Sequence, residues 1–135
     1  MAEKIKVKEY EVVKGLLYSK DHVWAKKEDS KIRIGVTDYA QKQLKEVISV
    51  ELPEEGEEVE KGDSIATLES IKTVADVFTP VTGKVVEVNT KLEEEPTLIN
   101  EDPYGEGWIA VIEASDPSEL EELMTAEEYS KEISK

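Results

Sequence analysis

Lys72 has the residue type and the setting that best suit a chemical role. It lies in the segment Glu69-Ser70-Ile71-Lys72-Thr73, between two largely apolar runs at 64–68 and 74–78. Such runs predict two strands, and the short segment between them predicts a hairpin with the lysine at its tip. The amine would point away from the core, where a modifying enzyme could reach it and a long attached group could move. Many hairpin tips carry an ordinary solvated lysine, so spacing alone leaves that simpler interpretation in place.

The other groups that could do chemistry are carboxylates and a single histidine. Glu69 lies three residues before Lys72, Asp76 lies four residues after it, and His22 follows Asp21. A lone histidine close to an aromatic residue is more often packed and hydrogen-bonded through one ring nitrogen than catalytic. The sequence has no glycine-rich phosphate loop and no His/Asp cluster at metal-ligand spacing. We therefore expect neither enzyme activity nor a metal site, and we interpret the glutamate runs as surface.

Length and composition limit the number of sites. With 135 residues, 39% of them hydrophobic, we expect a single domain over residues 1–135 with one modest core and no second substrate-binding domain. There are no cysteines, which excludes disulfides, thiolate metal sites, cysteine nucleophiles and a redox couple made of protein thiols. Redox chemistry would have to be supplied by something other than the side chains of the protein.

The charge of the chain restricts its partners. A net charge of −15 repels nucleic-acid phosphates and anionic membranes, so neither is expected as a partner. Protein partners should be basic or tolerant of charge, although acidity of this size also serves solubility alone. The first residues lack the features of a signal or transit peptide, and no segment reaches transmembrane length. These features predict a cytoplasmic protein, and we expect a monomer.

Apolar periodicity and turn residues predict a mostly β fold with short helices. Strands are expected at 23–26, 32–36, 64–68, 74–78, 84–88 and 108–112. Helices are expected from Asp38, which is taken as an N-cap, at 91–99, and over a helical C-terminal segment at about 116–133. Within that segment Thr125 and Glu128 have the spacing of a capping box at the start of the last helix. Frequent acidic turns between the short strands favour an antiparallel sandwich over a parallel sheet.

Several stretches, in order, resemble the glycine cleavage system H proteins, which are lipoyl carrier proteins. They are Gly35-Val36-Thr37-Asp38-Tyr39-Ala40-Gln41, Val50-Glu51-Leu52-Pro53, Leu68-Glu69-Ser70-Ile71-Lys72-Thr73-Val74, Pro80-Val81-Thr82-Gly83, Val86-Glu87-Val88-Asn89, Asn100-Glu101-Asp102-Pro103-Tyr104-Gly105-Glu106-Gly107-Trp108, Asp116-Pro117-Ser118-Glu119-Leu120 and Ala126-Glu127-Glu128-Tyr129. The resemblance runs from about Val13 to Ile133 and implies a barrel-sandwich hybrid of the lipoyl/biotinyl kind.

The resemblance implies a covalent cofactor. In that family the lysine of a Glu-Ser-Val-Lys-Ala type motif carries lipoic acid in amide linkage, and the matching residue is Lys72, with Ile71 and Thr73 as small variations. A biotin carrier would show Met-Lys-Met, and the lipoyl domains of 2-oxoacid dehydrogenases usually show Asp-Lys-Ala. Ile71 argues against both. A non-catalytic carrier is therefore implied, with N6-lipoyllysine as its working group.

The family's function implies four partners. A pyridoxal-phosphate-dependent glycine decarboxylase would load the aminomethyl group of glycine, and a folate-dependent aminomethyltransferase would remove it. A dihydrolipoyl dehydrogenase would reoxidise the carrier, and a lipoate ligase or transferase would attach the cofactor. Two alternatives remain open: an H-like protein that mainly relays lipoate to other lipoyl proteins, and a non-lipoylated structural or binding protein.

The resemblance also implies roles for residues around the lysine. Glu69 and Gly83 would be recognised by the attaching enzyme, although Gly83 could equally answer a need for positive φ. The family commonly has His-Glu-Trp, whose glutamate helps to hold the cationic amine of the loaded arm, whereas this chain has Val23 after the histidine. Valine cannot accept a hydrogen bond, so either Asp21 or Asp76 takes that part, or the loaded arm is held less firmly and releases its group more readily. We expect the first.

Overall fold

The computed structural model describes residues 3–135 as short strands and helices. The strands are β1 (Lys4–Val7), β2 (Tyr10–Val13), β3 (Leu17–Tyr18), β4 (Val23–Glu28), β5 (Lys31–Val36), β6 (Val47–Glu51), β7 (Glu58–Val59), β8 (Ser64–Ser70), β9 (Val74–Phe78), β10 (Gly83–Val88) and β11 (Ala110–Ala114). The helices are α1 (Asp38–Leu44), α2 (Lys91–Glu94), α3 (Leu98–Glu101), the 3-10 helix η1 (Pro117–Glu122) and α4 (Ala126–Ile133).

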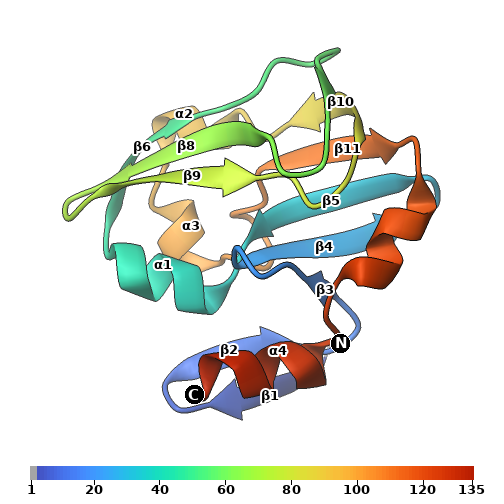
Figure 1. Cartoon of the computed structure of the whole chain (residues 1–135). Coiled ribbons are helices and arrows are strands. Elements are labelled where there is room, and N and C mark those ends of the chain that lie inside the picture. The colour runs from blue at the N-terminus through green and yellow to red at the C-terminus, as the bar shows by residue number, and fades with distance from the viewer. Residues whose placement is uncertain (1–2) are drawn as a thin grey trace.

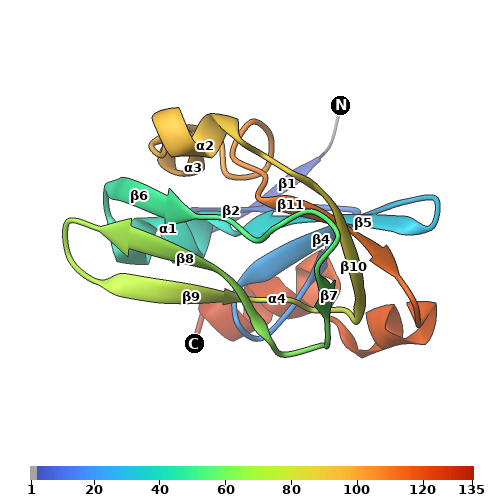
Figure 2. The same cartoon turned by 90° about the horizontal axis from the view of Figure 1, so that it is seen from above.

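Two antiparallel sheets enclose the main core. The larger has the strand order β3-β4-β5-β11-β10-β7 and the smaller has the order β6-β8-β9. Figures 1 and 2 show the smaller sheet lying across the strands of the larger one. Ile32 and Ile112 from the larger sheet and Leu68 and Val77 from the smaller one are buried in one apolar cluster. The mostly β fold with short helices that the sequence predicted is confirmed.

Helix α1 begins one residue earlier than the sequence suggested. Its N-cap is Thr37, whose side chain accepts a hydrogen bond from the backbone N–H of Ala40 at 3.2 Å, so the prediction of Asp38 as N-cap is wrong. Threonine and aspartate both serve as N-caps, so the sequence alone could not decide which of the adjacent residues Thr37 and Asp38 caps the helix. Asp38 is instead buried and accepts hydrogen bonds from the Glu11 backbone at 2.9 Å and the Gln41 side chain at 2.7 Å.

The helix predicted over 91–99 is two short helices, α2 and α3. Pro96 lies between them, and Glu95 before it has φ −128° and ψ 66°. Proline has no N–H and disfavours the α conformation in the residue before it, so one continuous helix cannot form here. The strand predicted over 108–112 is β11, two residues further on, and the first part of the segment at 116–133 is a 3-10 helix.

The N-terminal hairpin β1–β2 was not predicted from the sequence. Figure 1 shows this hairpin beside α4. The two elements contribute to a second apolar cluster that contains Tyr10, Val12, Tyr18 and Tyr129. Helix α4 starts with the capping box that the sequence predicted, in which Thr125 and Glu128 exchange hydrogen bonds. Over residues 3–135, none of the helices is long and apolar enough to cross a membrane.

Candidate functional site

Lys72 lies at the tip of the β8–β9 hairpin, between the end of β8 at Ser70 and the start of β9 at Val74, as the sequence predicted. Figure 1 shows this hairpin extending beyond α1. The side chains of Ile71, Lys72 and Thr73 are exposed, and the backbone N–H of Ser70 donates to the carbonyl of Thr73 at 2.8 Å to close the turn. Within residues 3–135, no ion pair involves the Lys72 ammonium. The lysine is therefore presented to solvent on a turn whose backbone is fixed.

Ser70 orders this turn from within. Its hydroxyl oxygen accepts hydrogen bonds from the backbone N–H groups of Lys72 at 3.2 Å and Thr73 at 3.0 Å, and the hydroxyl donates to the carbonyl of Thr73 at 3.1 Å. The Ser70 side chain is buried, so it is held in place by its surroundings as well as by these bonds. The sequence analysis missed this role, although a serine two and three residues before free N–H groups is a recognisable turn pattern.

The turn is also tied to the segment that follows α1. The backbone N–H of Ile71 donates to the carbonyl of Glu46 at 3.0 Å. Asn100 of α3 holds the same segment, because its amide donates to the carbonyl of Lys45 at 2.8 Å and its amide oxygen accepts from the backbone N–H of Val47 at 2.9 Å. These contacts join residues far apart in the chain, so no sequence pattern could have identified them.

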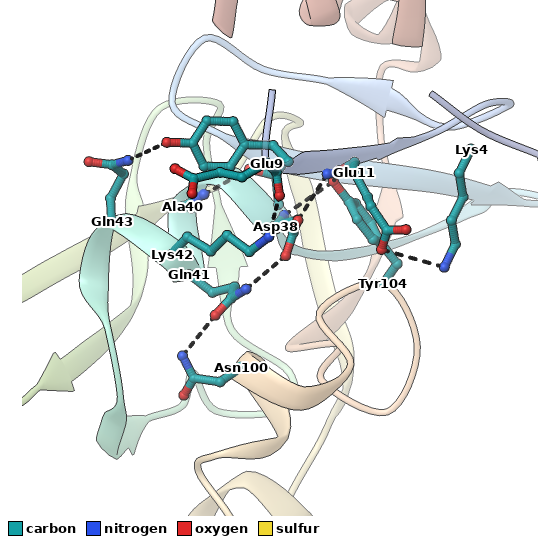
Figure 3. A network of polar contacts seen from close by, with 12 residues as sticks. Lys4, Glu9, Glu11, Asp38, Ala40, Gln41, Lys42, Gln43, Asn100 and Tyr104 are labelled. Atoms are coloured by element: carbon teal, nitrogen blue, oxygen red, sulfur yellow. Dashed lines mark hydrogen bonds and ion pairs between the residues drawn. The ribbon is translucent and has the colours of Figure 1, made fainter. Parts of the chain in front are cut away.

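A chain of polar contacts continues from Asn100 to the N-terminal hairpin (Figure 3). Asn100 donates to the amide oxygen of Gln41 at 2.9 Å, Gln41 donates to Asp38 at 2.7 Å, and Asp38 accepts from the backbone of Glu11 at 2.9 Å. Tyr104 adds a hydrogen bond to the Glu11 carbonyl at 2.7 Å. Hairpin β1–β2, α1 and α3 thus form one hydrogen-bonded support for the lysine-bearing turn.

A groove of about 580 Å³ opens beside Lys72. Its walls come from the turn between β1 and β2, from α1 and the residues after it, and from α3; they comprise Glu9, Tyr10, Gln41, Lys42, Gln43, Lys45, Glu46, Thr97, Asn100 and Glu101. Tyr10 is fixed there by a hydrogen bond from Gln43 to its hydroxyl at 3.0 Å and by an edge contact with Tyr39. The groove gives a group attached to Lys72 a place to lie on the protein surface.

Two of the predicted supporting carboxylates share the hairpin with the lysine. Glu69 on β8 is opposite Val74 on β9, and Asp76 is opposite Thr67, whose hydroxyl donates to it at 3.3 Å. Glu69 and Asp76 are both exposed. The structure therefore brings Lys72, Glu69 and Asp76 together on one element.

The comparisons with known proteins agree with this geometry. Residues 16–135 match the family model described as glycine cleavage H-protein. The chain belongs to the glycine cleavage H-protein family. These proteins are lipoyl carriers, so the family predicted from the ordered sequence stretches between Gly35 and Tyr129 is confirmed. The match begins after β2, so the hairpin β1–β2 lies outside the residues that the family model matches.

Individual H proteins match over most of their length. The glycine cleavage system H protein of Coprothermobacter proteolyticus is 55% identical over 123 residues, covering 90% of this chain and 97% of that protein. That of Thermoanaerobacter pseudethanolicus is 53% identical over 121 residues, covering 90% and 95%. The crystal structure of the H protein from Mycobacterium marinum has a TM-score of 0.82 and 37% identity, covering 88% of this chain and 96% of that one.

Asp21 and His22, which the resemblance singled out, do not line the groove at Lys72. The Nδ1 of His22 and the Tyr129 hydroxyl are 2.8 Å apart, and the imidazole packs on Tyr39 with ring centroids 4.7 Å apart. Burial lowers the pKa of His22, and the nearby Asp21 carboxylate opposes that shift. Asp21 itself lines a different hollow of about 540 Å³, beside Phe78 at the far end of β9.

Val23 and Gly83 have structural reasons for their identity. Val23 is 1% exposed in the main core, so the position at which H proteins commonly carry glutamate faces inward here. Gly83 begins β10 beyond the far end of β9, and its φ is not positive, so the alternative explanation that this glycine meets a need for positive φ is wrong. A Cβ at Gly83 would instead collide with the Glu113 backbone, whose carbonyl carbon would be 2.9 Å away. Close packing of β10 on β11 therefore explains this glycine.

Proposed function

We propose that this chain is the lipoyl carrier of a glycine cleavage system and that Lys72 is its attachment residue. The observation that carries the proposal is the exposed amine of Lys72, which has no ion-pair partner among residues 3–135, on a turn that hydrogen bonds to Ser70 and Glu46 hold in place. Conversion of the amine to an amide would break no ion pair within residues 3–135. The site therefore fits an acyl group on the lysine nitrogen.

Attachment requires only nucleophilic chemistry at Lys72. The deprotonated amine attacks the carbonyl of an activated lipoyl donor, such as a lipoyl adenylate, and a C–N bond forms while the acyl–phosphate bond breaks. AMP leaves with the bonding electrons, and the amine loses its proton to solvent. Glu69, exposed on the same hairpin, is a residue that the attaching ligase or transferase would recognise, and Gly83 would act more remotely by fixing β10.

The carrier role explains why the rest of the molecule is built as a support. When bound, lipoate supplies a dithiolane that takes up the aminomethyl group and two electrons, chemistry that a chain without cysteines cannot perform. Lys72 tethers that chemistry, which raises the effective concentration of the group at each docked partner. The partners are the pyridoxal-phosphate-dependent glycine decarboxylase, the folate-dependent aminomethyltransferase and the dihydrolipoyl dehydrogenase. The net charge of −15 favours docking to basic surfaces.

We further infer that Asp21 or Asp76 holds the cationic amine of the aminomethyl group. Val23 is buried and apolar, so it cannot do so, whereas both aspartates are exposed. The two aspartates lie at different places on the surface. Asp76 is on β9 near Lys72, whereas Asp21 is beside Phe78, at the opposite end of β9. Replacing each by asparagine should shorten the time for which the aminomethyl group stays on the protein. If neither replacement changes that time, this assignment is wrong.

The carrier role is tested by mass spectrometry of the protein from its native cells. The intact mass should show one lipoyl increment, and peptide mapping should place it on Lys72. The variant Lys72→Arg should carry no increment, whereas Lys84→Arg, a matched change on the exposed face of β10, should carry it in full. An unmodified Lys72 from cells that lipoylate their other carriers would overturn the proposal and favour a binding protein without a cofactor.

A further inference from the structure

Large exposed apolar side chains gather at the Lys72 end of the smaller sheet. Among residues 3–135, the large hydrophobic side chains with high exposure are Ile48 at 48%, Ile71 at 66% and Val74 at 61%. Scattered exposed apolar residues are ordinary, but a group of them at one place marks a contact surface. We call these three side chains the tip patch.

The tip patch surrounds the lysine-bearing turn. Ile71 comes directly before Lys72, and Val74 comes two residues after it at the start of β9. Ile48 lies on the neighbouring strand β6, where the register against β8 shifts. The hydrogen bond from Ile71 to the carbonyl of Glu46, two residues before Ile48, brings the turn against the start of this strand. A protein that reaches the Lys72 amine must therefore meet these side chains.

The surface beside the tip patch is acidic. Strand register places Ser49, Glu69 and Val74 side by side, and Glu51, Thr67 and Asp76 form the next row. Directly opposed residues in antiparallel strands project from the same face of the sheet. Glu69, Glu51 and Asp76, all exposed, thus lie on the same face as Val74. A complementary partner would have an apolar centre and a basic rim on this side.

We propose that the tip patch is the docking surface for the enzyme that acylates Lys72, an inference that rests on the carrier function proposed above. The attaching enzyme must bring its active site to the lysine nitrogen itself, within the reach of one side chain from the turn. The decarboxylase, the aminomethyltransferase and the dehydrogenase act at the end of a much longer arm. The attaching enzyme is thus the one partner whose active site must come within one lysine side chain of the tip.

The exposure of the patch argues against a role in the fold. Ile71 and Val74 are each more than half exposed, so their contribution to core packing is small. Their apolarity gains its full effect only when another surface covers them, because burial then removes apolar area from water. The hydrogen bonds that shape the turn come from Ser70 and from backbone groups and need neither side chain.

An isosteric pair of variants separates apolarity from shape. The first carries Ile48→Thr, Ile71→Thr and Val74→Thr, and the control carries Ile48→Val and Ile71→Val with Val74 unchanged. Valine and threonine have nearly the same shape and both favour strands, so the two proteins differ at each site by a hydroxyl in place of a methyl. Each is incubated with a lipoate–protein ligase, lipoate and ATP, and the kcat/KM for lipoylation of Lys72 is measured by mass spectrometry.

We expect the threonine variant to lose on the order of tenfold or more in kcat/KM, mainly through KM, because buried hydroxyls without partners are desolvated at a cost. The valine control should stay within about twofold of the wild type, since it keeps the patch apolar. Acetylation of Lys72 by an N-hydroxysuccinimide ester, which needs no docking, should proceed at the same rate in all three proteins. Equal unfolding midpoints would show that all three are folded.

The possible results distinguish the two proposals. Equal kcat/KM for the threonine and valine variants, with the wild type fully lipoylated, would overturn the docking role of the tip patch and leave the carrier function intact. Loss of N-hydroxysuccinimide reactivity in parallel with lipoylation would also overturn it, because the effect would then lie in the lysine and not in docking. A wild type that is never lipoylated on Lys72 would overturn the carrier function itself.

Discussion

The backbone N–H of Ile71 donates to the carbonyl oxygen of Glu46 at 3.0 Å, which joins the lysine-bearing turn to the segment that follows helix α1. Without this bond, the three tip residues 71–73 would be held in place only by β8 and β9, the strands on either side of them. Because of this bond, the position of Lys72 depends on the residues that fix Glu46. Those residues are Lys45, whose backbone turns the chain, and Asn100, which bonds to both neighbours of Glu46.

Replacement of Asn100 by alanine should loosen the support of the turn. The Asn100 side chain accepts a hydrogen bond from the backbone N–H of Val47 and donates to the Gln41 side chain and the Lys45 carbonyl. Its loss leaves these three groups without their partner. We expect the free energy of unfolding to fall by about 2–3 kcal/mol. Thr97→Ala is the matched control on the same helix, because the Thr97 side chain makes no capping hydrogen bond. Denaturant unfolding measures both, and equal stabilities of the two variants would contradict this role.

Exchange of Lys45 for glycine should stabilise the protein. Lys45 has φ 68° and ψ −153°, a backbone conformation that residues with a Cβ rarely adopt. Glycine adopts it without strain but loses more entropy on folding, so the net gain is about 1 kcal/mol. The control is Lys45→Ala, which removes the same side chain and keeps the Cβ. Thermal unfolding should show a higher midpoint for glycine only; a similar rise for alanine would point to the lysine charge instead.

Loss of the Ser70 hydroxyl should free the turn around Lys72. Ser70→Ala removes the acceptor for the N–H groups of Lys72 and Thr73, which then exchange with solvent faster, at a cost of about 1 kcal/mol in stability. Amide hydrogen exchange at these two positions is the direct measurement. Ser70→Thr keeps an oxygen at this place and should retain most of the protection. Unchanged exchange in the alanine variant would show that the strands alone hold the turn.

The sequence was sufficient to predict the features that are formed by residues close together in the chain. Largely apolar runs located β8 and β9, so the position of Lys72 at a hairpin tip could be predicted from the order of the residues alone. The capping box of Thr125 and Glu128 is likewise a local pattern that the structure confirms. Both features depend on residues close together in the chain.

The parts that the sequence did not predict depend on contacts between distant residues. The bonds of Asn100 to Val47 and of Glu11 to Asp38 span 53 and 27 positions and follow no periodicity. Of the two explanations that the sequence offered for Gly83, the need for a positive φ is wrong, because only the packing of β10 on β11 reveals how close the backbone of Glu113 comes. A single sequence shows which residues can bond but not which distant partners they meet.

The pKa of His22 predicts how stability should change with pH. Burial lowers this pKa below the ordinary value of about 6.5, and Asp21 opposes the shift. Because the folded protein binds the proton less readily than the unfolded chain, the stabilisation is complete above about pH 6.5 and is lost as the pH falls toward the lower folded pKa. The bond between His22 and the Tyr129 hydroxyl links this titration to the docking of α4.

The comparison of wild type with His22→Gln isolates this effect, since His22 is the sole histidine of the chain and both proteins share the same carboxylates. Denaturant unfolding between pH 8 and pH 5 should show that the wild type loses more stability than the variant as the pH falls. NMR titration of the imidazole should give a folded pKa below that of the unfolded chain. A stability difference between the two proteins that stays constant over this range would mean that burial does not perturb His22.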